Sequence, residues 1–394
     1  MPSGEAARPR VLRLLTFSTL YPNAARPNHG VFVENRLRHL LASGEAESRV
    51  LAPVPWFPGR TPPLPPRREE RHGIELRHPR FLAVPGLGLA SNPFALYAAA
   101  RAELRRMMRE GFDFDLLDGH YLYPDGVAAA WLAREFGKPV VLTARGSDTS
   151  QLPHLPVAGR LIRAALREAD ALIAVSAGLR DGLVALGAAP GTVTVLRNGV
   201  DTALFRPPGD RAALRAELGF AGPVILSVGL LIERKRHHLT IEAVAALPGV
   251  RLVILGEGPE RAALEALARR LGVADRVSLA GARPHDELPR WYGAADAMVL
   301  ASSREGWANV LLESMACGTP ALATPAWGMT EAIGAPAAGE VVAEATPEAI
   351  AAGLRRLLAP GWDRAATRAH AEAFGWEETT QGQLRLFREV LAGR

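Results

Sequence analysis

The chain is poor in residues that could cross-link it. It has one cysteine, Cys317, in 394 residues. A single thiol excludes an intramolecular disulfide and supplies no cluster for a structural zinc, so the sequence predicts a reducing, cytoplasmic compartment. We expect Cys317 itself to be a small buried side chain at the end of a helix.

Long hydrophobic runs are also missing. The apolar run 11–16 follows several arginines but is too short for a signal peptide, and we expect it to be the first strand. No stretch approaches the length of a membrane-spanning helix. With 48% hydrophobic and 22% charged residues, the composition is that of a soluble globular protein. A chain of 394 residues is too long for one compact core, so two domains are predicted.

Charge is unevenly distributed along the chain. Residues 1–200 hold 25 Lys and Arg against 18 Asp and Glu, a net charge of +7, whereas the remainder has a net charge of −2. The basic half would suit an acidic partner. No D-x-D-like metal site stands out, and no G-x-G-x-x-G opens the first domain, where Asn28-His29-Gly30 stands instead. This last absence argues against a dinucleotide-dependent oxidoreductase.

Short apolar segments alternate with amphipathic ones along the whole chain, which is typical of parallel α/β sheets. The pattern predicts two Rossmann-like domains with a boundary near residue 200, where Asn198-Gly199-Val200-Asp201 forms a turn-rich hinge. The proline-rich segment 52–66 is expected to be a loop or a polyproline excursion within the first domain. The predicted strands are 11–17, 116–117, 140–143, 171–175 and 193–196, then 224–228, 251–255, 277–280, 297–301 and 321–323.

Two glutamates, Glu305 and Glu313, are separated by seven residues in the most informative stretch of the sequence. The residues around them predict a buried strand over 297–301 and a short helix over 309–317, opened by Asn309 as a polar cap. The connecting loop then lies at the carboxyl edge of a parallel sheet, where open α/β folds bind ligands.

In that position Glu305 would face a cleft. The backbone N–H groups at the start of the helix, at Asn309 and Val310, would suit a phosphate. Glu313, expected in about the first turn, would place a carboxylate beside them that suits sugar hydroxyls. The alternative is that both glutamates are solvated residues favoured by the helix dipole.

Lys235 lies between the predicted strand 224–228 and a predicted helix over 238–246. A cation in a strand-to-helix loop can neutralise a diphosphate as a glycosidic bond breaks. A solvated basic loop is the alternative.

The first domain offers two comparable positions. Gly30 stands at the end of a long loop before a predicted helix over 33–41, where a glycine lets the backbone approach a phosphate closely. A plain flexible loop is equally compatible with this pattern. His120 ends the strand that begins at residue 116, so it could contact a substrate at the sheet edge, although a lone histidine is usually structural.

These motifs together resemble the retaining glycosyltransferases of the GT-B family 4, across almost the whole chain. Glu305 and Glu313 match the E-x7-E signature, and Met-Ala-Cys-Gly-Thr-Pro follows the second glutamate. Residues 227–235 are similar to the family's G-R-L-x-x-x-K loop, in which Arg and Lys hold the donor pyrophosphate. Lys235 matches the lysine, but Leu230 replaces the arginine, and Arg234 is the candidate substitute.

The resemblance assigns further sites. Glu257 lies in a turn similar to the family's G-x-G-P turn near the nucleotide, and Arg283 lies where the family packs around the base. Gly30 matches its glycine loop, and His120 its active-site histidine. In the string that resembles the family's H-G-x-D loop, Arg145 replaces the histidine. This guanidinium would suit an acceptor phosphate or carboxylate, or would pair with Asp148.

Membership would imply transfer of a sugar from a nucleotide sugar, UDP-sugar rather than GDP-sugar, to a glycan, lipid-linked or small-molecule acceptor. Transfer would proceed with retention and without a metal, and no nucleic acid would be involved. Domains 1–200 (acceptor) and 201–372 (nucleotide sugar) would be followed by a helix in 373–394 that crosses back to the first domain. Catalysis would use His120, Glu305 and Lys235. The alternatives are a nucleotide-sugar epimerase of similar fold and a silent binding subunit.

A cluster of arginines suggests where an acceptor would be met. Arg101, Arg105, Arg106 and Arg109 lie on a predicted helix. They motivate the hypothesis of peripheral docking to the cytoplasmic leaflet, where a lipid-linked or growing polysaccharide acceptor would be presented. Large aromatic anchors are missing from this predicted helix, so a solvated arginine face remains the alternative.

Overall fold

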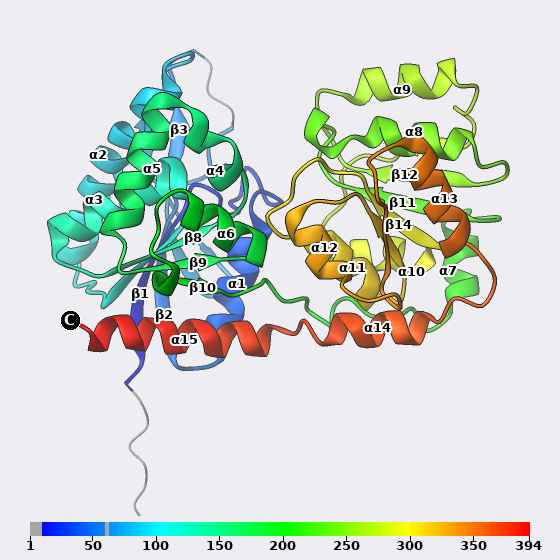
Figure 1. The fold of residues 1–394 in the computed structure, drawn as a ribbon. Helices are drawn as coiled ribbons and strands as arrows, with labels where there is room; N and C mark the ends of the chain where they lie inside the picture. The colour runs from blue at the N-terminus through cyan, green and yellow to red at the C-terminus, as the bar shows by residue number, and fades with distance from the viewer. Residues whose placement is uncertain (1–9, 60–62) are drawn as a thin grey trace, which may run out of the picture. The chain divides into compact units, whose positions relative to one another are not determined.

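The computed structural model describes residues 10–59 and 63–394. The residues ahead of the first strand (1–9) and part of the proline-rich segment (60–62) lie outside this description. The chain forms two compact units (Figure 1). Unit 1 comprises residues 1–196 and 377–394, and unit 2 comprises residues 197–376. Each is an α/β unit built on a mainly parallel sheet.

Unit 1 contains an eight-stranded sheet in the order β10-β9-β8-β7-β1-β2-β5-β4, in which only β4 runs antiparallel to its neighbour. A separate parallel pair joins β3 to β6. The strands are β1 (Leu12–Phe17), β2 (Ala46–Leu51), β3 (Val54–Trp56), β4 (Arg68–Arg71), β5 (Ile74–Arg77), β6 (Arg80–Leu82), β7 (Leu116–His120), β8 (Val140–Ala144), β9 (Ala171–Ala174) and β10 (Val193–Val195).

The helices of unit 1 cover this sheet. They are α1 (Val31–Ala42), α2 (Gly88–Arg109), α3 (Val127–Phe136), α4 (Ser147–Ser150), α5 (Pro156–Glu168), α6 (Ala177–Ala185) and α15 (Trp376–Ala392). The C-terminal α15 belongs to unit 1 and runs along it (Figure 1). Its Leu384 and Phe387 are fully buried in the same core as Leu14. The last helix is therefore part of the first unit's core.

Unit 2 contains a six-stranded parallel sheet in the order β13-β12-β11-β14-β15-β16. Its strands are β11 (Val224–Val228), β12 (Arg251–Leu255), β13 (Val277–Leu279), β14 (Ala297–Leu300), β15 (Ala321–Ala323) and β16 (Gly339–Val341). Its helices are α7 (Arg211–Glu217), α8 (His237–Ala245), α9 (Arg261–Arg270), α10 (Leu288–Ala294), α11 (Asn309–Ala316), α12 (Trp327–Ile333), α13 (Pro347–Leu357) and α14 (Arg364–Glu372).

The prediction of parallel α/β sheets is confirmed, and all ten predicted strands form within three residues of the expected bounds. The expectation of a loop over 52–66 is wrong in part, because Val54–Trp56 forms β3. The strands β2, β3, β4, β5, β6 and β16 were missed. Two of them are charged: β2 carries Glu47 and Arg49, and β4 reads Arg-Glu-Glu-Arg at the sheet edge.

The strand order of each sheet contains a reversal. In unit 1, β2 lies on one side of β1 and β7 on the other; in unit 2, β12 lies on one side of β11 and β14 on the other. Helical connections leave such neighbouring strands in opposite directions, which opens a crevice at their carboxyl ends. The loops after β1 and β7, and those after β11 and β14, are therefore where each unit can bind a ligand.

Candidate active site

The crevice of unit 2 brings together two of the predicted catalytic residues. Lys235 follows β11 and Glu305 follows β14, and Lys235 Nζ lies 2.6 Å from Glu305 Oε1. Arg234 Nη1 lies 3.3 Å from Glu305 Oε2 and donates to the Arg304 carbonyl at 2.8 Å. A carboxylate flanked by two cations thus stands at the switch point of the sheet.

The ion pair is only slightly exposed, with side-chain exposures of 13% for Lys235 and 11% for Glu305. Burial alone would raise the pKa of Glu305, but the charges of Lys235 and Arg234 outweigh it and hold this pKa below its usual range. Glu305 is therefore an anion at neutral pH, able to accept hydrogen bonds from hydroxyl groups.

A glycine-rich backbone lines the same edge. A Cβ on Gly256 would lie 1.8 Å from the Gly229 carbonyl oxygen, so only glycine allows the loops after β11 and β12 to touch. The Leu231 N–H donates to the Glu257 carbonyl at 2.8 Å. The side chain of Glu257 is exposed, as is Leu230 at 59%. Glu257 therefore contributes its backbone to the loop packing.

The start of α11 lies where a phosphate-binding site was predicted, but it lacks the predicted polar cap. Asn309 is the first residue of the helix; the N-cap is Ala308, and no side chain caps it. The expectation that Asn309 caps the helix is thus wrong. Its Oδ1 accepts instead from Asn198 Nδ2 at 3.3 Å. An uncapped helix start leaves the N–H groups at Asn309 and Val310 suited to an anion.

Glu313 lies differently from the prediction. It is in the second turn of α11, and its buried carboxylate points to side chains rather than to the helix start. Glu313 Oε2 accepts from the Tyr292 hydroxyl at 3.0 Å, and Oε1 lies 3.1 Å from His285 Nε2. Burial alone would lower the pKa of His285, but the hydrogen bond to Glu313 and its charge raise this pKa above its ordinary value. Burial and the charge of Glu313 raise the pKa of the Tyr292 hydroxyl.

His285 and Tyr292 were missed by the sequence analysis, which singled out Arg283 in the same segment. The only available signal was that His285 follows a parallel strand, β13, at the carboxyl edge. Arg283 itself lies with its guanidinium carbon 5.4 Å from the centre of the Trp291 ring. This cation–π contact holds the guanidinium against α10, two residues before His285 in the chain.

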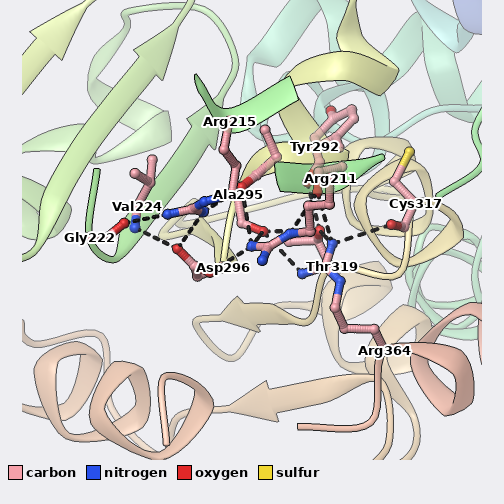
Figure 2. Close-up of polar contacts among 12 residues, drawn as sticks. Arg211, Arg215, Gly222, Val224, Tyr292, Ala295, Asp296, Cys317, Thr319 and Arg364 are labelled. Carbon is pink, nitrogen blue, oxygen red and sulfur yellow. Dashed lines mark hydrogen bonds and ion pairs between the residues drawn. The ribbon is translucent and has the colours of Figure 1, made fainter. Parts of the chain in front are cut away.

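Three arginines hold the C-terminal ends of α10 and α11, the helices that carry Tyr292 and Glu313 (Figure 2). Asp296 binds Arg211 at 2.6 Å and Arg215 at 3.0 Å. Arg364 donates to the Thr319 hydroxyl at 2.6 Å and to the Cys317 carbonyl at 3.4 Å. Cys317 is fully buried at the end of α11, as predicted, and burial raises its pKa to about 12.

In unit 1, Gly30 is the N-cap of α1 and has a φ of 72°. A Cβ there would lie 1.7 Å from the Leu20 carbonyl oxygen, so the loop after β1 requires glycine for its own packing. Asp125 ties down the same loop: it accepts from the Thr19 N–H and, at 3.0 Å, from the Thr19 hydroxyl. Burial raises the pKa of Asp125 to about 7.

His120 ends β7 at the crevice of unit 1 and is fully enclosed. Its Nε2 lies 3.1 Å from Asp118 Oδ2, and its Nδ1 lies 2.7 Å from Arg145 Nη2. A guanidinium can only donate, so Nδ1 accepts and Nε2 carries the proton. Burial lowers the pKa of His120, which keeps it neutral. Both ring nitrogens are thus engaged within unit 1, and contact with a sugar stays a prediction.

Arg145 and Asp148 do interact, but not through the predicted ion pair of side chains. The Asp148 carboxylate accepts from the backbone N–H of Arg145 at 3.0 Å and of Gly146 at 2.6 Å. The guanidinium of Arg145 is directed to His120 instead. The residue that replaces the expected histidine therefore sets the tautomer of His120.

Asp113-Phe114-Asp115 does have D-x-D spacing, which the sequence analysis passed over. Asp115 pairs with Arg13 at 3.0 Å and Arg10 at 2.6 Å, and Asp113 pairs with Lys138 at 2.8 Å. Both carboxylates are therefore used in ion pairs. Over residues 10–59 and 63–394 no group of three or more metal-binding side chains is assembled.

Comparison with known proteins agrees with this geometry. Residues 30–204 match the model of Glycosyltransferase Family 4, and residues 189–373 match that of Glycosyl transferases group 1. The chain is 34% identical to a D-inositol 3-phosphate glycosyltransferase of Acidothermus cellulolyticus over 84% of this chain and 80% of that protein. A second such enzyme, from Catenulispora acidiphila, is 31% identical over 97% and 96%.

Solved structures share the fold. Sucrose-phosphate synthase from Thermosynechococcus elongatus superimposes with a TM-score of 0.81 at 22% identity, over 98% of this chain and 100% of that one. Anabaena HepE in complex with UDP and glucose gives 0.72 at 20% identity, over 95% and 98%. By its sequence relatives and its fold, the chain belongs to the GT-B glycosyltransferases of family 4.

Proposed function

We propose that the protein transfers a glycosyl unit from a UDP-sugar to an acceptor with retention at the anomeric carbon and without a metal. The observation that carries this proposal is the contact of Lys235 with Glu305 at the switch point of unit 2. This contact places a cation that can stabilise the leaving diphosphate beside an anion that can bind sugar hydroxyls, and the transfer requires both.

The reaction breaks the bond between the anomeric carbon and the diphosphate oxygen. Lys235, with the N–H groups that begin α11, stabilises the negative charge that develops on that oxygen. Glu305 holds the hydroxyls of the sugar. The departing phosphate accepts the proton of the acceptor hydroxyl as the new glycosidic bond forms on the same face, so no carboxylate has to act as a covalent nucleophile.

Glu313 is proposed to bind the ribose of the nucleotide. Its two oxygens already accept from Tyr292 and lie against His285, which fixes the plane of the carboxylate and leaves one lone pair on each oxygen. A pair of vicinal hydroxyls is the ligand that this arrangement fits. UDP is favoured over GDP because a structural neighbour, Anabaena HepE, is in complex with UDP.

The acceptor is proposed to be a phosphorylated polyol, because the sequence relatives are named D-inositol 3-phosphate glycosyltransferases. A glycan or lipid-linked acceptor is the alternative. The proposed compartment is the cytoplasm, because nucleotide sugars are present there and its reducing conditions suit the single free cysteine, Cys317. In the part of the chain that the structure describes, every helix is too short or too polar to cross a membrane.

The test is to incubate the purified protein with UDP-sugars, with and without D-inositol 3-phosphate, and to follow the anomeric signals by NMR. Acceptor-dependent release of UDP with an α-linked product from an α-linked donor supports the proposal. An inverted product would refute retention, and a change in the donor without any acceptor would favour the epimerase alternative. Activity lost in chelator and restored by a metal would refute metal independence.

A further inference from the structure

A chain of polar side chains links the C-terminal helix α15 to the crevice of unit 1. We call it the relay; its members are Arg36, Gln383, Asp118, His120 and Arg145. The first four are each 1% exposed. Arg145, directly after β8, is partly exposed. The relay therefore runs from the interior of unit 1 to the carboxyl edge of its sheet.

Gln383 is a polar residue on the buried side of α15. Its neighbour Leu384 and the nearby Phe387 belong to the core of unit 1. A Cβ on Gly382 would lie 2.5 Å from a methyl carbon of Leu196, so glycine lets the helix approach closely at this point. A buried amide costs free energy unless it is hydrogen-bonded. The partners of Gln383 therefore decide what it does.

Both ends of the Gln383 amide are hydrogen-bonded. Its Oε1 accepts from Arg36 Nε at 2.9 Å, and its Nε2 donates to Asp118 Oδ2 at 3.3 Å. A guanidinium only donates and an ionised carboxylate only accepts, so the amide has a single possible orientation. Arg36 is anchored in turn, because its Nη1 donates to the Leu196 carbonyl at 3.0 Å. Gln383 is thus a neutral spacer between a buried cation and a buried anion.

The Asp118 carboxylate has few other partners. Its Oδ2 also lies 3.1 Å from His120 Nε2, which carries the proton of the ring. Its Oδ1 has no hydrogen-bond partner within the described part of the chain. Burial alone would raise the pKa of Asp118, but His120, Arg36 and Arg145 lower it, so the carboxylate stays ionised. Gln383 is therefore one of the two groups that hold this anion in place.

The relay ends on Arg145. The lone pair of His120 Nδ1 accepts from Arg145 Nη2 at 2.7 Å. The guanidinium carbon lies 5.2 Å from the centre of the Phe32 ring, which is at the start of α1. Because α1 follows the loop after β1, this places the cation beside the crevice of unit 1. The position of the guanidinium thus depends on a ring that Asp118 and Gln383 hold.

We propose that Gln383 is a positioning residue for the acceptor side of the active site. It acts through Asp118 and His120 on the guanidinium of Arg145, a cation that suits the phosphate of the proposed acceptor. The proposal rests on the proposed glycosyl transfer, with unit 1 as the unit that binds the acceptor. In this account α15 contributes to the site as well as to the core of unit 1.

The substitution Gln383→Glu tests the relay. It keeps an oxygen for Arg36 Nε but replaces the donor to Asp118 with a second carboxylate oxygen. Two facing carboxylates disfavour double ionisation, so the introduced carboxyl should have a raised pKa. When protonated, it reproduces the hydrogen bonds of the amide, because its carbonyl oxygen accepts and its O–H donates. The variant should therefore work at low pH and fail as the pH rises.

Steady-state transfer from a UDP-sugar to D-inositol 3-phosphate measures this effect. At about pH 8 the kcat/KM of Gln383→Glu for the acceptor should be on the order of tenfold below that of the wild type, and the gap should close toward about pH 5. UDP binding should not change, since the nucleotide is assigned to unit 2. Gln381→Glu, at a partly exposed glutamine of the same helix, is the matched control and should behave as the wild type does.

Comparison with the wild type at each pH removes other titrations from the result. The charged groups that face His120 or Arg145 are Asp118 from β7, Arg36 from α1 and Asp148 from α4. All are present in both proteins. The ring signals of His120 in ¹⁵N NMR give a second readout that needs no activity. They should change with pH in Gln383→Glu and not in the wild type or Gln381→Glu.

A double-variant cycle shows whether Gln383 acts through Arg145. Arg145→Ala should itself lower kcat/KM for the acceptor, and adding Gln383→Glu should lower it little further. Thermal unfolding checks that each variant is folded. If Gln383→Glu does not fold, Gln383→Asn, whose shorter amide cannot span both partners, takes its place in the cycle.

Three results would overturn the proposal: equal effects of the two glutamine variants, a loss in Gln383→Glu that does not depend on pH, or fully additive losses with Arg145→Ala. Each would leave Gln383 as a residue that only supports the fold. A wild type that transfers no sugar would refute the proposed transfer instead, and unchanged His120 signals in Gln383→Glu would then refute the relay as well.

Discussion

Replacing Lys235 with alanine separates the structural and the chemical roles of its pair with Glu305. The substitution removes the cation at 2.6 Å and leaves Glu305 with Arg234 at 3.3 Å. Removing one partner of a fully buried ion pair costs about 3–5 kcal/mol. Because both side chains keep about a tenth of their exposure and Arg234 remains, we expect a loss of roughly 1–3 kcal/mol in the free energy of unfolding.

The loss of turnover should be larger than this loss of stability. A group that stabilises charge only as the diphosphate leaves contributes about 100- to 1000-fold to kcat, with little effect on the KM for the donor. The double variant Lys235→Ala with Glu305→Gln removes the carboxylate that has lost its lysine, so it should regain much of the stability and none of the turnover. Chemical unfolding and steady-state kinetics on the three proteins measure both effects.

The pH dependence follows from the direction of the shift. The pKa of Glu305 is lowered in the folded state from its ordinary value of 4.5, so its stabilising contribution is present above that value and is lost as pH falls through the folded pKa. The stability difference between wild type and Lys235→Ala should therefore shrink in acid. Wild-type kcat in Lys235→Ala, or a double variant no more stable than the single one, would refute the reasoning.

Three further outcomes are expected. Glu313→Ala should weaken UDP binding by about 1.5–3 kcal/mol in calorimetry, and Tyr292→Phe should give a smaller loss of binding. Glu305→Ala should mainly lower kcat. Equal, small effects of the two glutamate substitutions on kcat/KM would contradict these roles. The pKa of Asp125 is raised by burial from 3.8 to about 7, so the folded state holds the proton more tightly. The wild type should then lose stability relative to Asp125→Asn as pH rises from about 4 to about 7, by at most about 4 kcal/mol, and a pH-independent difference would show that Asp125 does not titrate in this window. Transfer should be unchanged by a chelator, and inhibition reversed by added metal would argue otherwise.

The sequence predicts the parts of the fold that are dictated by local apolar periodicity. Strands such as β11 and β14 are fully buried runs, and the apolar pattern alone places their loops at one sheet edge. The adjacency of Lys235 and Glu305, which are 70 residues apart, follows from that topology. Charged strands such as β4 escape the same reasoning because they lie at the sheet edge and carry no apolar pattern.

The hydrogen-bond partners of the site side chains could not be predicted from the sequence. Glu313 was expected beside the start of its own helix, but Tyr292 and His285 approach it from a different segment, and only tertiary packing brings them there. Similarly, the Arg145 guanidinium reaches His120 rather than its near neighbour Asp148. The distant ring offers a lone pair, whereas the Asp148 carboxylate is already taken by three backbone N–H groups.

Thermal unfolding with UDP tests the central claim most directly, because it requires no knowledge of sugar or acceptor. At a concentration about a hundredfold above the dissociation constant, UDP should stabilise the wild type by roughly 2.7 kcal/mol. The same concentration should stabilise Glu313→Ala and Lys235→Ala clearly less. A wild type that UDP leaves unshifted, or variants shifted as far as the wild type, would contradict the assignment of the nucleotide site to the crevice of unit 2.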